Sequence, residues 1–126
     1  MKRNTRTLLL SLTMLVALLE LIYAIPFVGG SIIISLGWQP LLFNAFLYFI
    51  LTLILLVDTQ NTIRPMVAFT IIGLIGSFIA FIPFVGFFIH WILLCMMLVL
   101  IFIIFNTPIY LPNKNARVIY EKDRLK

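Results

Sequence analysis

The chain has 126 residues, of which 63% are hydrophobic and 10% are charged. Soluble domains carry about 45–50% apolar and about 25% charged residues, so this composition excludes an ordinary water-soluble domain and a disordered chain. Between Thr7 and Asn113 the formal charges are limited to Glu20, Asp58 and Arg64, too few to cover a folded surface in water. We therefore expect a single all-α transmembrane domain over residues 1–126.

Interruptions in the apolar sequence divide it into spans of membrane length. A helix crosses about 30 Å of hydrocarbon with about 20 apolar residues. Pro26 ends the first apolar stretch and Asp58 ends the second. The stretch from Met66 to Phe105 is about twice the length of one crossing, so it must fold back at Pro83–Gly86. The sequence thus predicts an integral membrane four-helix bundle, with spans at approximately 8–25, 41–57, 66–82 and 87–105.

The basic residues predict the orientation of these spans. All nine Lys and Arg residues precede the first span, lie in the middle loop or follow the last span. The positive-inside rule then makes both termini cytoplasmic in a multi-pass protein of a cell membrane. A cleaved signal peptide is the alternative for the N-terminus. Glu20 within the apolar stretch and bulky Ile22 near the candidate cleavage point after Ala24 disfavour it.

A pentapeptide occurs twice. Residues 25–29 and 82–86 both read Ile-Pro-Phe-Val-Gly, and each copy follows an odd-numbered span. One interpretation is a duplicated helical hairpin, with parallel rather than inverted repeats. The other is that Pro followed by Gly simply ends a helix in each place. Between the first two spans, residues 29–38 are uncharged and largely apolar, which favours a position at the membrane interface over a re-entrant segment.

Polar side chains within the spans are the candidate functional residues. An ionisable group in a span is a functional candidate by default, and Glu20 is the acidic one in the first span. With the predicted topology it shares the outer half of the bilayer with other polar side chains. The predicted intramembrane cluster is Glu20, Asn44, Tyr48, Ser77 and His90. Such a cluster either holds helices in register by hydrogen bonds or relays a proton.

Small residues predict a packing face on the third span. Gly73, Gly76 and Ala80 recur at helical spacing, and small residues let membrane helices approach closely. Cys95, the single cysteine, has no intrachain partner and is expected to be a packing residue. The sequence contains no metal-ligand spacing, phosphate loop or nucleophile motif, so we expect no catalytic residues, no metal and no cofactor.

The basic tail, residues 106–126, predicts contacts outside the hydrocarbon. It is expected to lie against anionic lipid headgroups or a cytoplasmic partner, and its charge is better explained by the bilayer than by nucleic acid. Its basic residues are Lys114, Arg117, Lys122, Arg124 and Lys126.

Three functions are compatible with these features. The first is a non-catalytic tetraspan protein of a bacterial envelope, an accessory or membrane-stabilising factor that acts through lipid and protein contacts as a homo-oligomer or as a subunit of a larger complex. The second is a proton-coupled small transporter or channel that works as an oligomer through Glu20. The third is a pore-forming, holin-like protein or an immunity protein. The length, the four spans and the acid in the first span resemble the small multidrug resistance transporters in layout, but Leu18-Leu19-Glu20-Leu21-Ile22 lacks the small and polar neighbours of that family's acid.

Overall fold

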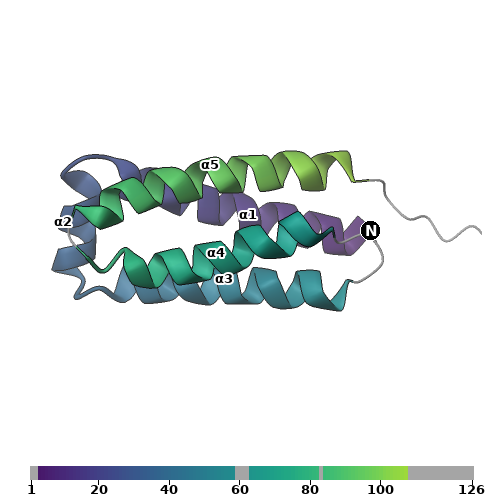
Figure 1. Ribbon diagram of the computed structural model, residues 1–126, viewed down its shortest axis with the longest axis horizontal. Helices are drawn as coiled ribbons and strands as arrows, with labels where there is room; N and C mark the ends of the chain where they lie inside the picture. Colours follow the sequence, from purple (N-terminus) through teal and green to yellow (C-terminus); the bar gives the residue numbers. More distant parts are fainter. Residues whose placement is uncertain (1–2, 59–62, 83, 108–126) are drawn as a thin grey trace, which may run out of the picture.

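A computed structural model describes residues 3–58, 63–82 and 84–107, and all the regular secondary structure in this part of the chain is helical (Figure 1). The prediction of an all-α fold is therefore confirmed. The described helices are α1 (Arg3–Ala24), α2 (Val28–Ser35), α3 (Gln39–Val57), α4 (Arg64–Ile79) and α5 (Val85–Asn106).

The helix ends follow from local chemistry. Helix α1 stops at Ala24, two residues before Pro26, because a residue before proline is pushed out of the helical region. Helices α3 and α4 both carry proline in the first turn, Pro40 and Pro65, where the missing N–H costs nothing. The predicted spans are thereby shifted by a few residues, and the third is shorter than expected because α4 ends at Ile79.

Length and composition make three of these helices, α1, α3 and α5, suitable for crossing a membrane. Helix α4 is also apolar but has 16 residues. The four longest helices run side by side along the molecule, and α2 lies across one end (Figure 1). Helix α2 had not been predicted as a helix. It satisfies the backbone of an apolar segment internally, which an irregular loop in apolar surroundings cannot do.

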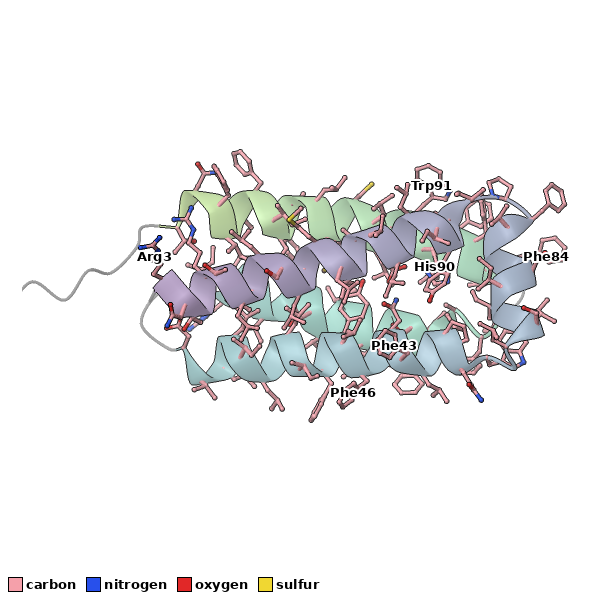
Figure 2. All side chains as sticks on the ribbon, turned by 180° about the vertical axis from the view of Figure 1, so that it is seen from behind. Arg3, Phe43, Phe46, Phe84, His90 and Trp91 are labelled. Atoms are coloured by element: carbon pink, nitrogen blue, oxygen red, sulfur yellow. The ribbon has the colours of Figure 1, made fainter. Side chains whose placement is uncertain are left out.

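The ends of the molecule differ in charge. Arg3 lies at the end away from α2, whereas Phe84 lies at the α2 end (Figure 2). Close to Arg3 in the chain, Arg6 donates a hydrogen bond to the carbonyl oxygen of Phe105 and lies over the Phe105 ring at 5.5 Å from its centroid. The start of α1 is thus attached to the end of α5, at the end where the described basic residues Arg3, Arg6 and Arg64 are found.

The predicted small-residue face lies in the interior. Gly73, Gly76 and Ala80 are all buried. A Cβ on Gly73 would overlap the ring of Tyr48 on α3, and one on Gly76 would lie 3.1 Å from the Leu93 side chain on α5. Helix α4 therefore packs closely against both neighbours. Cys95, in contrast, is exposed on α5, so its expected role in packing is wrong: it lies on the outer face of the helix.

The two Ile-Pro-Phe-Val-Gly copies have similar backbone geometry at the residues that the structure describes in both. Phe27 has φ 67° and ψ −40°, and Phe84 has φ 65° and ψ −46°. In both copies the glycine N–H donates to the isoleucine carbonyl, at 3.1 Å for Gly29 and 2.9 Å for Gly86. Both glycines also pack against a backbone carbonyl that a Cβ would overlap. The repeat in sequence is thus a repeat in local structure.

Candidate functional site

The carboxyl group of Glu20 binds side chains of two other helices. Asn44 Nδ2 and Tyr48 Oη, both on α3, donate to Glu20 Oε1 at 2.6 and 2.8 Å. His90 Nδ1, on α5, lies 2.5 Å from Glu20 Oε2. Glu20 is fully buried and His90 is 2% exposed. Figure 2 shows His90 between the helices, toward the α2 end. This Glu20 cluster, Glu20 with Asn44, Tyr48 and His90, connects α1, α3 and α5.

Sequence periodicity explains why these residues meet. Asn44 and Tyr48 are four residues apart, so they lie on the same face of α3, one turn from each other. Thr13, Ala17, Glu20 and Ala24 form the corresponding buried face of α1. His90 is in the second turn of α5, and α5 is the closest neighbour of α1 along much of its length. The cluster therefore forms where the buried faces of α1, α3 and α5 meet.

The protonation state of the Glu20–His90 pair determines whether the second ring nitrogen, His90 Nε2, donates or accepts a hydrogen bond. A buried pair with net charge is costly, so we consider the two states without net charge. In the ion pair, both ring nitrogens of the imidazolium carry hydrogen. In the neutral pair, the carboxyl group donates to Nδ1, and the ring hydrogen is on Nε2. His90 Nε2 is an N–H donor in both of these net-neutral states, and it would be an acceptor only if a neutral His90 donated from Nδ1 to an ionised Glu20; it has no hydrogen-bond partner among the described residues.

An apolar pocket of about 380 Å³ lies beside His90 at the α2 end. Its lining comes from the ends of α1, α4 and α5, from α2 and from the two repeated turns. The lining residues used below are Tyr23, Gly30, Ile33, Trp38, Ala80 and His90, together with Phe27 and Phe84. The Tyr23 and His90 rings pack with centroids 5.3 Å apart at 56°. Trp38 stacks on Phe81 at 5.6 Å, which fixes the pocket wall where α2 leads into α3.

The remaining predicted site residues have separate environments. Ser77 is buried, but its described hydrogen bond goes to the carbonyl oxygen of Gly73 in its own helix, at 2.9 Å. The basic tail residues Lys114, Arg117, Lys122, Arg124 and Lys126 lie outside the described residues. A second polar contact, which sequence reasoning did not identify, joins α3 to α4: the hydroxyls of Thr52 and Thr70 lie 2.9 Å apart. The buried stripe Asn44, Tyr48, Thr52 was the available signal for it.

Tyr23 and helix α2 are the functional elements that the sequence analysis missed. Tyr23 follows Glu20 by three residues, so helical spacing places it next to the buried face of α1. That spacing could have identified it. Helix α2 lies across the end of the molecule because of the way the two turns pack, and residue spacing along the sequence does not predict that packing.

In the described part of the chain, no three His, Cys, Asp or Glu side chains are grouped so as to hold a metal ion. The chain matches no family model, and no curated protein or solved structure is detectably similar to it. The geometry of the Glu20 cluster and the adjoining pocket is therefore the basis for assigning a function.

Proposed function

We propose that the chain is a non-catalytic, four-span protein of a bacterial cytoplasmic membrane, and that it acts through contacts with lipids and other membrane proteins as an accessory or stabilising factor. The observation that carries this proposal is the distribution of polarity. The buried carboxylate is bonded to three helix-borne side chains, whereas large apolar side chains cover the exposed faces of the helices. In lipid, an apolar exterior around an interior in which the acidic group is hydrogen-bonded is the expected arrangement.

Helix α4 is the fourth span in this proposal. Its 16 residues rise about 24 Å, less than the typical hydrocarbon thickness of about 30 Å. It packs against α3 and α5 along the molecule and carries exposed Ile71, Ile75 and Phe78. A locally thinned bilayer accommodates a short span at modest cost. Its exposed apolar side chains support a lipid-facing location.

The proposed orientation places the Arg3 end in the cytoplasm and α2 outside. Cysteine labelling tests this in a Cys95→Ser background, because Cys95 is the single cysteine. We expect Ser35→Cys on α2 to react in intact cells with a membrane-impermeant maleimide, and Asn106→Cys to react only after the membrane is permeabilised. The reverse pattern contradicts the orientation, and labelling of both in intact cells contradicts an even number of spans.

The accessory role is tested by native mass spectrometry of the protein extracted gently from its own membranes. A stoichiometric foreign subunit supports the role and gives the identity of the complex. A homo-oligomer without such a subunit contradicts membership of a larger complex and leaves a role through lipid contacts, and a monomer contradicts both predicted forms of assembly. The Glu20→Gln variant extracted in the same way shows whether assembly depends on the Glu20 cluster.

Proton-coupled transport is the second candidate, and the close contact of Glu20 with His90 favours it. This is a pair of ionisable groups buried in the outer part of the proposed membrane domain, and such pairs occur in proton relays. Proteoliposomes with an internal pH dye test it. Proton uptake that is lost in Glu20→Gln, with unchanged oligomer size and stability, supports transport. Equal uptake by the wild type, the variant and empty liposomes excludes it.

A further inference from the structure

We propose that the pocket at the α2 end binds an uncharged apolar molecule that presents a carbonyl oxygen to Nε2–H of His90. This assigns a ligand site to the protein and does not depend on the accessory role or on the orientation in the membrane.

The polar end of the site is His90. It lines the pocket, and Glu20 holds its Nδ1 on the opposite edge of the ring. Because the two ring nitrogens point in divergent directions, Nε2 faces away from Glu20. Nε2 is a hydrogen-bond donor in both net-neutral states of the pair, and it lacks a partner among the described residues. A buried donor without a partner costs free energy, which a ligand oxygen recovers.

The rest of the pocket specifies an apolar, uncharged ligand. Isoleucine and phenylalanine make up half of the lining residues, and none of the lining residues is Lys, Arg, Asp or Glu. The described Lys and Arg residues lie at the opposite end of the molecule, so an anionic headgroup has no counter-charge here. A volume of about 380 Å³ falls within the usual range for small-molecule sites, about 300–1,000 Å³.

Access to Nε2 requires a small rearrangement at the pocket floor. The nitrogen is covered in the structure, and the ring of Tyr23, which also lines the pocket, packs against the His90 ring. Side-chain movements of this kind are fast compared with ligand exchange. The ligand oxygen is therefore expected to displace the Tyr23 ring from part of its contact with His90.

Two strained phenylalanines at the pocket mouth support a binding role. Phe27 is 91% exposed and Phe84 is 88% exposed, so neither gains packing inside the protein. Both nevertheless have positive φ, and Val28 N–H donates to Pro26 O at 2.8 Å around Phe27, which defines a classic γ-turn. That turn is rare and strained for a residue with a side chain. Strain retained at a rim without internal packing is typical of ligand sites.

Tryptophan fluorescence provides the direct test. The chain has two tryptophans: Trp38 lines the pocket, and Trp91 is exposed on α5. In Trp91→Phe protein in lipid nanodiscs, Trp38 is the sole tryptophan. We expect 2-methyl-1,4-naphthoquinone to quench it saturably. The Trp38→Phe protein reports on Trp91, which does not line the pocket but follows His90 directly, and it is expected to show a smaller saturable component beside the linear quenching of a quinone dissolved in the bilayer. Linear quenching in both proteins would overturn the proposal.

The carbonyl contact is tested with a matched ligand and two His90 variants. 2-Methylnaphthalene has the same ring system without oxygen, and it should compete for the site about tenfold less well than the quinone because one hydrogen bond is missing. His90→Asn keeps an amide donor near Nδ1 for Glu20 but lacks Nε2, and should weaken quinone binding by a similar factor. His90→Gln places a donor near Nε2 and should bind better than His90→Asn. Equal competition by both ring compounds refutes the hydrogen bond.

A pocket-filling variant leaves the Glu20 cluster intact. Gly30 lines the pocket and has open space around the position of a Cβ, so Gly30→Leu should abolish saturable quenching without changing the thermal stability of the protein. Ala68→Leu is the matched control, because Ala68 is exposed on α4 away from the pocket. Undiminished binding by Gly30→Leu would place the quinone elsewhere and overturn the assignment of this pocket.

Two biological sources offer this ligand chemistry, a quinone head or the ester carbonyl of an uncharged glycerolipid. Competition separates them. Displacement of the naphthoquinone by dioleoylglycerol, but not by an ether-linked analogue, supports a lipid ester as the ligand. Displacement by a long-chain menaquinone alone supports a quinone. Displacement by none of these compounds overturns the proposed ligand class.

Discussion

Replacement of Glu20 by leucine is expected to be the most damaging single change in the interior of this protein. Leucine has nearly the same length but offers no acceptor. Asn44 Nδ2, Tyr48 Oη and His90 Nδ1 would then lose their shared partner while remaining buried. Interhelical hydrogen bonds in membrane proteins are each worth about 0.6–2 kcal/mol. Loss of three therefore lowers the free energy of unfolding by about 2–6 kcal/mol.

Glutamine at the same position separates charge from hydrogen bonding. Its carbonyl oxygen still accepts from Asn44 and Tyr48, and its amide can donate to His90 Nδ1, as the protonated carboxyl group does in the neutral pair. We expect Glu20→Gln to cost less than about 1.5 kcal/mol. A loss for Glu20→Gln as large as that for Glu20→Leu would show instead that the ion pair itself stabilises the bundle.

The assay is unfolding by sodium dodecyl sulfate in mixed dodecylmaltoside micelles, followed by tryptophan fluorescence. Trp38 reports on tertiary structure because it stacks on Phe81 at 5.6 Å. Thr13→Ala is the matched control. Thr13 is buried on the same helix, but its hydroxyl bonds to Leu9 O within α1, at 2.6 Å. If Glu20→Leu unfolds at the same detergent fraction as Thr13→Ala, the Glu20 cluster does not hold the helices together.

Other substitutions test the packing and the turns by the same assay. Gly73→Ala should lower the stability by about 1–3 kcal/mol, because its Cβ overlaps the Tyr48 ring, which the bond to Glu20 holds in place; unchanged stability would contradict this close approach. Phe27→Gly should raise the stability by about 1 kcal/mol, since glycine relieves the positive φ and the exposed ring makes no packing contribution; a loss of stability would mean that the turn is not strained. A double-mutant cycle of Thr52→Val and Thr70→Val should give a coupling energy of about 0.6 kcal/mol, and a value near zero would show that the two hydroxyls do not bond.

Periodicity predicted the interior of this fold well because a helix places residues at i, i+3, i+4 and i+7 on one face. The small-residue face of α4 was identified in that way, whereas Glu20, Asn44 and Tyr48 were identified as polar residues within apolar spans, and these three side chains meet in the structure. His90 was identified because it is an ionisable residue near the start of the fourth predicted span. In a nearly uncharged apolar sequence, a polar residue within a span is informative because burying it requires a partner.

The same reasoning failed where a polar side chain has more than one possible hydrogen-bond partner. Ser77 was predicted to join the cluster, but its hydroxyl bonds to Gly73 O one turn earlier in its own helix. Serine and threonine in apolar helices commonly do this, and spacing alone does not distinguish the two outcomes. Cys95 illustrates a related limit. On an all-apolar helix such as α5, the lipid-facing and interior faces have nearly the same composition, so residue type does not show which face is buried.

The pocket gains its chemical character from a difference between the two halves of the chain, each of which contains one copy of the repeated turn. Positions 57 residues apart recur in its lining, and five such pairs are found there: Tyr23 and Ala80, Ile25 and Ile82, Phe27 and Phe84, Gly30 and Phe87, and Ile33 and His90. Two equivalent turns alone would enclose an apolar space without a preferred ligand orientation. At positions 57 residues apart, the second half has His90 where the first half has Ile33, and the first half has Glu20 where the second half has Ser77. Each half therefore supplies one member of the Glu20–His90 pair. Neither half by itself provides both the histidine at the pocket and the carboxyl group that orients its ring. Exchange of the two residues, as the double variant Ile33→His and His90→Ile, tests whether the position of the histidine matters: we expect the histidine on α2 to lose the contact with Glu20 and the naphthoquinone to lose saturable binding, and saturable binding by this variant would contradict the role given to His90.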